Sequence, residues 1–287
     1  MLKQAAQAPA AHAAAFRTLS LVTCAQDAVA APAAVDLARA LGATLHAACL
    51  VPTARMGSLA QAEVRYDLVE AEQRDALERA RVAAEALSRA AQAAGVPVEA
   101  LAVSKEDPVC EETLTEVLRL SDLVVLPQPQ PGTPRATDEP FEDLLTESGR
   151  PCLIIPYAGR PRIPFRTVTV AWDGSAPAAR ALSDSLPLLR QAAVVDVVRV
   201  AKDFAPEGAR MAGRVTAFLA AHGIEARFRT LVSSLTFSEA ILSHMADTGS
   251  DLLVMGAYGH SRLREALVGG ASRGILASMT VPVLMSH

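Results

Sequence analysis

Apolar positions along the chain fall into short continuous runs that alternate with segments of helical spacing, most clearly in residues 165–287. The expected strands there are Thr167–Ala171, Val194–Val200, Ile224–Val232, Leu252–Met255 and Val281–Met285, and the expected helices are Pro177–Gln191, Glu207–His222, Ser238–Thr248 and Ser272–Ser278. Strands that alternate with helices of this length indicate crossover connections and a mainly parallel sheet. Because the strands are apolar throughout, we expect both faces of that sheet to be covered.

Three short segments occur twice and in the same order. The pairs are Phe16–Val22 with Phe165–Ala171, Ser121–Leu126 with Ser250–Met255, and Arg150–Ile155 with Thr280–Met285. Shared details such as Phe-Arg-Thr and Ser-Asp-Leu make chance similarity of apolar strands a poor explanation. The repeat predicts two domains, 16–157 and 165–287, joined by the Pro/Gly/Arg segment Tyr157–Pro164.

The first half follows the same order, with a longer and charged helix expected over residues 57–94. The acidic and basic residues of this helix are most simply a solvated face with many close-spaced pairs. The predicted fold class is therefore α/β, with two tandem, doubly wound, mainly parallel five-stranded domains of Rossmann-like type.

Composition is that of a folded, soluble protein, with 51% hydrophobic and 20% charged residues, and no stretch resembles a spanning helix. The opening residues, Ala-rich and interrupted by polar side chains, do not resemble a signal peptide. Cys24, Cys49, Cys110 and Cys152 form no metal-ligand spacing, and each has an apolar context. Such thiols favour a reducing cytoplasm.

Charge divides unevenly between the halves. Residues 1–149 carry 12 basic and 21 acidic side chains, and residues 150–287 carry 15 basic and 10 acidic ones. A basic second half favours an anionic ligand, although opposite charges would also help two domains to dock. The acidic first half and the 4% of aromatic residues argue against a nucleic-acid-binding platform.

The segment that follows the expected strand Leu252–Met255 is rich in glycine. Gly256 and Gly259 let a backbone approach a ligand closely, and Gly269 and Gly270 come directly before an expected helix. Free N–H groups at a helix start attract phosphate, and ligands of open α/β sheets bind beyond the carboxyl ends of the strands. The spacing is neither GxGxxG nor a Walker loop.

The spacing Gly256-x2-Gly259-x9-Gly269 resembles the nucleotide loop of the universal stress protein family. The strand end with Asp173 and Gly174-Ser175 and the closing strand around Pro282 are also similar to that family. The resemblance covers nearly all of residues 165–287 and, more weakly, 16–157, so the chain resembles a tandem universal stress protein of the adenine nucleotide α-hydrolase-like fold.

The resemblance implies an adenine nucleotide, ATP, ADP or AMP, with Mg²⁺, in the second domain. Asp173 would lie at the nucleotide, the backbone of Val200 would read the adenine edge, and the loop would hold ribose and phosphates. The residues expected at the ligand are Ala171, Asp173, Val200, Gly256, Gly259, His260, Gly269, Gly270, Ala271 and Ser272.

This sequence departs from the family pattern at Gly270, which stands where Ser or Thr is usual. The change removes a hydroxyl contact, for which Ser272 could compensate, and it leaves ATP, ADP, AMP or no nucleotide open. The first half departs further, because Cys24 takes the place of Asp173 and Pro127 that of Gly256. We therefore expect a degenerate first domain that binds no nucleotide in the family manner.

Single residues also have simpler readings. Asp173 could be a helix-capping or turn residue, and His260 could be a solvated loop side chain. No histidine has partners at metal spacing, and no nucleophile–base pair emerges, so neither a metal site nor a catalytic group is expected. Slow ATP hydrolysis would be compatible with bound ATP.

The leading hypothesis is an intracellular tandem universal stress protein that responds to an adenine nucleotide in its second domain. The resemblance implies that the final strands of the two domains, Cys152–Pro156 and Val281–Met285, pair within the chain as an intramolecular pseudo-dimer. Further homodimerisation stays open. One alternative is a nucleotide-free interaction module of the same fold, and another is a weak ATPase or adenylating enzyme.

Overall fold

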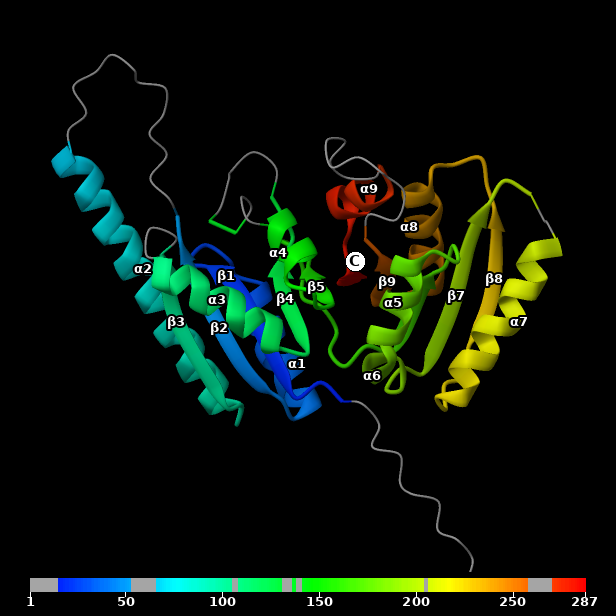
Figure 1. Ribbon diagram of the computed structural model, residues 1–287, viewed down its shortest axis with the longest axis horizontal. Coiled ribbons are helices and arrows are strands. Elements are labelled where there is room, and N and C mark those ends of the chain that lie inside the picture. Colours follow the sequence, from blue (N-terminus) through cyan, green and yellow to red (C-terminus); the bar gives the residue numbers. More distant parts are fainter. Residues whose placement is uncertain are drawn as a thin grey trace, which may run out of the picture.

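The strands form one continuous sheet. The computed structural model describes residues 15–52, 66–104, 108–130, 136–137, 141–203, 206–257 and 270–287. Within these residues the sheet has ten strands in the order β3-β2-β1-β4-β5-β10-β9-β6-β7-β8. Figure 1 shows the N-terminal half on the left and the C-terminal half on the right, with the C-terminus in the middle. The predicted α/β class is confirmed, and each half has the doubly wound strand order 3-2-1-4-5.

The first half alternates strands with helices as expected. Its elements are β1 (Thr18–Cys24), α1 (Ala30–Leu41), β2 (Thr44–Val51), α2 (Tyr66–Ala93), β3 (Val98–Ser104), α3 (Pro108–Leu120), β4 (Leu123–Pro127), α4 (Phe141–Glu147) and β5 (Cys152–Ile155). The expected long helix is α2, and the part of that expectation before residue 66 lies outside the described residues.

The second half repeats the order. Its elements are β6 (Thr167–Ala171), α5 (Ala176–Asp184), α6 (Leu186–Leu189), β7 (Val194–Ala201), α7 (Pro206–Ala221), β8 (Arg227–Val232), α8 (Phe237–Thr248), β9 (Leu252–Gly256), α9 (Gly270–Ser278) and β10 (Val283–Ser286). The prediction of one helix over Pro177–Gln191 was wrong, since it divides at Ser185 into α5 and α6. Pro187 has no N–H to donate to Ser183, so the first helix cannot continue through it.

The two halves meet at β5 and β10. These strands pair antiparallel, with Ile154 opposite Val283 and Cys152 opposite Met285, whereas all other strand pairs among the described residues are parallel. The pairing of these two final strands, which the family resemblance implies, is therefore observed. It covers two sheet edges that would otherwise be open.

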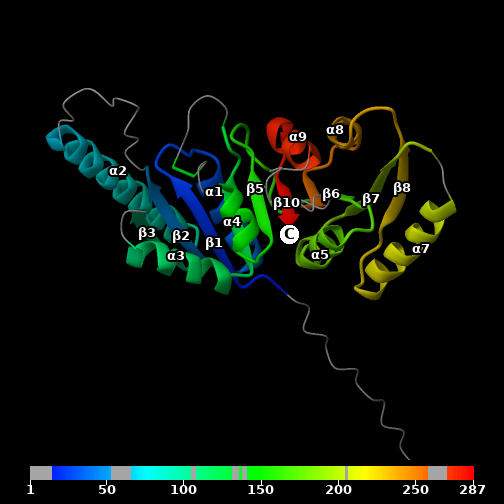
Figure 2. The same cartoon turned by 45° about the horizontal axis from the view of Figure 1, so that its top comes forward.

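Helices cover both faces of the sheet, as the apolar strands predict (Figure 2). One buried cluster combines the sheet with α1, α2, α5, α6 and α7, and a second combines the opposite face with α3, α4, α8 and α9. Both clusters include residues of both halves, so the core continues across the β5–β10 seam. No helix among the described residues has the length and apolar character needed to cross a membrane.

Candidate functional site

The candidate site lies at the carboxyl ends of β6 and β9. These neighbouring strands are followed by helices on opposite faces, because α5 belongs to one buried cluster and α9 to the other. The strand order of the second half reverses at this point, which is where open α/β sheets form a ligand crevice. Since β9 and β10 are parallel, the helix between them runs backwards, and α9 begins at this same edge.

Asp173 holds the turn that leaves β6. Its Oδ1 accepts a hydrogen bond from the backbone N–H of Ser175 at 2.8 Å, and Gly174 between them has a φ of 81°. Ser175 in turn caps α5 by accepting from the N–H of Ala178 at 3.3 Å. The simpler reading of Asp173 as a turn residue therefore has direct support, while Ser175 is the helix cap. The Asp173 side chain is nevertheless exposed, so a ligand could reach its carboxylate.

Gly256 ends β9 against the start of α5. A Cβ atom there would lie 2.6 Å from the backbone N of Ala178 and 2.8 Å from Cβ of Pro177. Such distances are far below van der Waals contact, so this close packing of strand and helix requires glycine. The sequence suggested that Gly256 lets the backbone approach a ligand, and the structure adds a packing role that draws the β6–α5 turn against β9.

The first residues of α9 differ in exposure. Gly270 and Ala271 are exposed, and no atom of the described residues lies within 4 Å of the position where a Cβ of Gly270 would be. Ser272 is only 3% exposed, which places its hydroxyl inside the packing of α9 instead of at the open helix start. Gly259, His260 and Gly269 of the glycine loop lie outside the described residues.

Val200 lies where β7 runs beyond its neighbour. The last residue of β7 that pairs with β6 is Val198, opposite Ala171, and β7 continues to Ala201. On the other side Val200 still pairs with Leu231 of β8. The edge of Val200 that faces β6 is thus past the end of β6, at the edge where the candidate site lies.

Arg199 is a site residue that sequence reasoning missed. Its Nη1 is shielded from solvent and has no hydrogen-bond partner among the described residues. It packs under Gly208 of α7, where a Cβ would lie only 3.2 Å from Nη1. A Cβ on Gly174 would likewise lie 3.2 Å from the side chain of Met211, one turn further along α7. The guanidinium group and the Asp173 turn therefore contact consecutive turns of one helix. The only signal in the sequence is a basic residue within an apolar strand.

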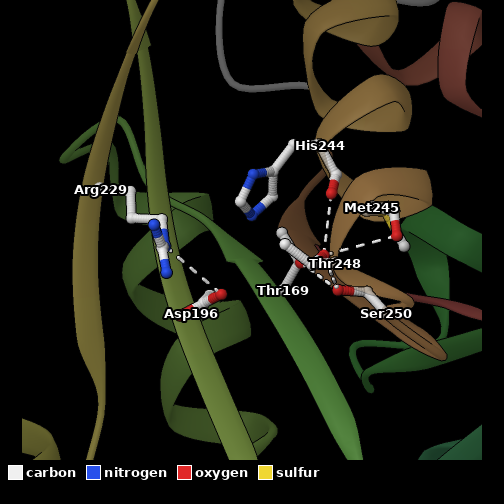
Figure 3. Close-up of polar contacts among 7 residues, drawn as sticks. All are labelled: Thr169, Asp196, Arg229, His244, Met245, Thr248 and Ser250. Atoms are coloured by element: carbon white, nitrogen blue, oxygen red, sulfur yellow. Dashed lines mark hydrogen bonds and ion pairs between the residues drawn. The ribbon is translucent and has the colours of Figure 1, made fainter.

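A second polar cluster lies beneath α8, on the opposite face of the sheet from Arg199. Figure 3 shows the imidazole of His244 reaching from α8 toward Asp196 of β7 and Arg229 of β8. Asp196 is 2% exposed, and its Oδ2 lies 3.5 Å from Nε of Arg229. Burial lowers the pKa of His244, against the opposing effect of the Asp196 charge, while Arg229 lowers it further.

Hydroxyl groups extend this cluster to β6. Ser250 lies 2.8 Å from the hydroxyl of Thr169 and 2.9 Å from that of Thr248, and Thr248 donates to the carbonyl of His244 at 2.8 Å (Figure 3). Thr169 pairs with Asp196 well before the carboxyl ends of the strands, so this cluster is separate from the candidate site. It anchors α8 on the sheet. In the described part of the chain, no group of three or more His, Cys, Asp or Glu side chains could hold a metal ion.

The same edge of the first half is built differently. Cys24, in the place of Asp173, is 2% exposed, and the nearby Asp27 accepts from the hydroxyl of Thr23 at 2.9 Å and from the N–H groups of Val29 and Ala30. Oδ1 of Asp27 thus serves the start of α1, while Oδ2 is bonded to Thr23 of β1. Pro127, in the place of Gly256, ends β4.

Taken together, the strand order and the helices on both faces define a doubly wound α/β protein. Residues 164–287 match the model of the universal stress protein family. Universal stress protein Slr1230 from Synechocystis sp. (strain ATCC 27184 / PCC 6803 / Kazusa) is 30% identical over 155 residues, and the match spans 50% of this chain and 49% of that relative. The C-terminal half of the chain is thus similar to universal stress proteins, and the chain spans about half the length of the curated relative that it matches.

Solved structures show the same fold over nearly the whole chain. A universal stress protein from Archaeoglobus fulgidus DSM 4304 is similar with a TM-score of 0.67 and 16% identity, covering 93% of this chain and 97% of that one. A protein of unknown function from Pseudomonas aeruginosa PAO1 is similar with a TM-score of 0.53 and 17% identity, covering 95% and 92%. At this level of identity the likeness concerns the fold alone.

Proposed function

We propose that the second half of the chain, residues 165–287, binds an adenine nucleotide and that the first half, residues 16–157, does not. The observation that carries the proposal is the exposed carboxylate of Asp173, at the end of a central strand in the half that matches the family. In the other half a buried Cys24 occupies that place. By binding a nucleotide at Asp173, the protein would respond to the state of the cell and act as an intracellular stress-response module.

The described residues of the edge fit such a ligand. The backbone of Val200 past the end of β6 could read the adenine edge, and the exposed start of α9 offers N–H groups for phosphate oxygens. Arg199 adds a guanidinium N–H that has no partner among the described residues. Asp173 and the phosphates together would supply the oxygen ligands that Mg²⁺ prefers.

In this proposal the first half has a structural role, which is to pair with the second half. Its strand β5 pairs with β10 in the manner of a second subunit, so the chain would act as an intramolecular pseudo-dimer. Further association of two chains is an open outcome of the same experiments.

Calorimetric titration of the full chain with ATP, ADP and AMP, each with Mg²⁺, tests the proposal. We expect one site per chain. Asp173→Asn should weaken binding at least tenfold, because the amide oxygen can keep the turn to Ser175 but carries no charge. Asp27→Asn is the matched control in the first half and should bind as the unmodified chain does. Absence of binding for all three nucleotides would refute the proposal.

A nucleotide-free interaction module is the second candidate, and a specific observation favours it. Gly270 lacks the hydroxyl of the family pattern, and Ser272 is buried, so no serine hydroxyl stands at the described start of α9. This candidate predicts that freshly purified protein carries no adenine. Release of product from ATP by the chain would instead favour an enzyme.

A further inference from the structure

Gln128 connects the two halves through its side chain. It is the first residue after β4, and it is only 1% exposed. Its Nε2 donates to the carbonyl oxygen of Leu276 in α9 at 2.6 Å, and its Oε1 accepts from the backbone N–H of Tyr157 at 3.1 Å. Its own N–H donates to Ile155 at 2.7 Å. Both polar atoms of the Gln128 side-chain amide are therefore hydrogen-bonded, and the bond from Nε2 reaches a helix of the second half.

The bond to Leu276 satisfies a helix end. The last four carbonyl groups of a helix have no partner within it, and Leu276 is one of the last residues of α9. Leu276 is half-buried, and leaving its carbonyl unpaired would cost free energy, so this donor stabilises the end of α9. The opposite end of the same helix is Gly270, at the edge where the candidate site lies. A nine-residue helix is only about 14 Å long, so a shift of its C-terminal end would also displace its first residues.

Only the first half makes this side-chain contact; the equivalent position of the second half does not. Ala257 follows β9 as Gln128 follows β4, and its N–H donates to Ser286 at 2.8 Å as that of Gln128 does to Ile155. The backbone arrangement is thus repeated in both halves, but alanine has no amide with which to reach α4. The first half holds a helix of the second through this position, and the second half does not return the contact from Ala257.

We propose that Gln128 is a positioning residue for the nucleotide site, through which the first half fixes α9 and hence the N–H groups at its start. The inference rests on the proposed function and extends it, because it gives the degenerate half a part in ligand binding. Coupling of this kind is reciprocal, so a nucleotide at the start of α9 also strengthens the contact between Gln128 and Leu276.

The test compares Gln128→Met with Gln130→Met in the full chain. Methionine keeps the volume of Gln128 without its donor, and Gln130 is an exposed neighbour that serves as the matched control. By calorimetric titration of ATP with Mg²⁺, we expect Gln128→Met to raise Kd about five- to thirtyfold at unchanged stoichiometry, and Gln130→Met to leave it unchanged. An unchanged Kd in Gln128→Met would overturn the proposal.

Amide hydrogen exchange supplies a readout that does not need nucleotide. We expect faster exchange in residues 270–278 of Gln128→Met, with the amides of β1 and β2 protected as in the unmodified chain. If the unmodified chain binds no nucleotide, the proposed function fails, and exchange in α9 alone then decides whether Gln128 positions it. Equal loss of protection throughout the chain would show a merely structural role and overturn the proposal.

Gln128→Glu keeps the argument testable if the methionine variant does not fold. When ionised, glutamate still accepts from the N–H of Tyr157 but cannot donate to Leu276, so at a pH where it is charged it isolates the bond between the halves. It should reproduce the weaker nucleotide binding and the faster exchange of α9. Binding and exchange equal to those of the unmodified chain would contradict the proposal.

Discussion

The carboxylate of Asp251 accepts a hydrogen bond from the backbone N–H of Thr167, 3.0 Å away and 84 positions earlier in the chain. It accepts a further bond from the N–H of Arg166. In the first half, Asp122 makes the equivalent bond to the N–H of Thr18 at 3.0 Å. The two segments whose repetition divides the sequence into halves, Phe-Arg-Thr and Ser-Asp-Leu, are thus bonded to each other within each half.

The serines of the repeated segments do the same with side chains. Ser250 bonds to the hydroxyl of Thr169, and Ser121 bonds to that of Ser20. All four side chains are buried. The repeat therefore preserves a set of polar contacts, made by Asp251 and Ser250 in one half and by Asp122 and Ser121 in the other. These contacts join the start of the first strand of each half to the start of its fourth strand.

Removing the hydrogen bonds of Asp251 should destabilise the second half. Asp251→Ala leaves the N–H groups of Arg166 and Thr167 without their acceptor, and we expect the free energy of unfolding to fall by about 1–3 kcal/mol. Asp251→Asn keeps one acceptor oxygen and should cost less. Urea denaturation measures both, and Glu225→Ala, at an exposed position, is the control. Equal stability of Asp251→Ala and the control would contradict this role.

The packing of Gly256 predicts opposite effects for two glycine-to-alanine substitutions. At Gly256 a Cβ would meet the backbone of Pro177 and Ala178 at 2.6 Å, and we expect Gly256→Ala to destabilise the fold by about 1–3 kcal/mol. At Gly213, within α7, a Cβ would have no atom of the described residues within 4 Å, and alanine should stabilise the helix by up to about 1 kcal/mol. Thermal unfolding of the two variants without ligand checks the difference. A harmless Gly256→Ala would mean that the turn after β6 does not pack as described.

Features encoded by neighbouring residues could be predicted from the sequence. The strand and helix order of the second half follows from local apolar spacing, and the three repeated segments predicted that the first half has the same order. The predicted helix bounds were wrong where a residue interrupts the backbone hydrogen bonds, as Pro187 does between α5 and α6. The position of Asp173 at the end of a central strand is also a local property, because it follows directly from the strand before it.

Features that depend on distant contacts could not be predicted in this way. Gly256 is glycine because α5, which is some 80 positions earlier, lies against it, and no local pattern shows this. The roles of Arg199 and Gln128 depend on the helices that pack over them, α7 and α9. Likewise no local pattern shows that His244 lies near Asp196, because only the fold brings α8 over β7.

Buried thiols should resist modification in the folded protein. Burial raises the pKa of Cys49 to about 11, helped by the nearby Cys24 and Asp27, and burial raises that of Cys152 to about 12 despite its contact with Ser148. The thiolate is the reactive species, so at pH 8 we expect little reaction of either residue with iodoacetamide.

Mass spectrometry of labelled peptides measures this reactivity. A Cys110→Ser background restricts the count to the thiols of Cys24, Cys49 and Cys152. Labelling of all three in guanidinium chloride is the positive control. Rapid labelling of Cys49 or Cys152 in native protein would show that the strands around them open far more readily than their burial indicates.

The environment of His244 predicts how stability depends on pH. Burial lowers the pKa of His244 from its ordinary value of 6.5; the charges of Asp196 and Asp247 oppose the shift, and Arg229 supports it. The folded state therefore binds fewer protons than the unfolded state below pH 6.5. Stability should be constant above about pH 7 and should fall as the pH drops through 6.5 toward the lowered pKa, by at most about 1.4 kcal/mol per pH unit.

Comparison with His244→Gln isolates this contribution from that of the carboxylates. The free energy of unfolding, measured in urea from pH 5 to 8, should fall less steeply on acidification in the variant. The histidine resonances in NMR titration should give a pKa below 6.5 for His244, and Asp196→Asn should lower it further, because the opposing charge is gone. A pKa above 6.5 would mean that the charge of Asp196 outweighs burial, and the folded protein would then gain stability on acidification through this pair.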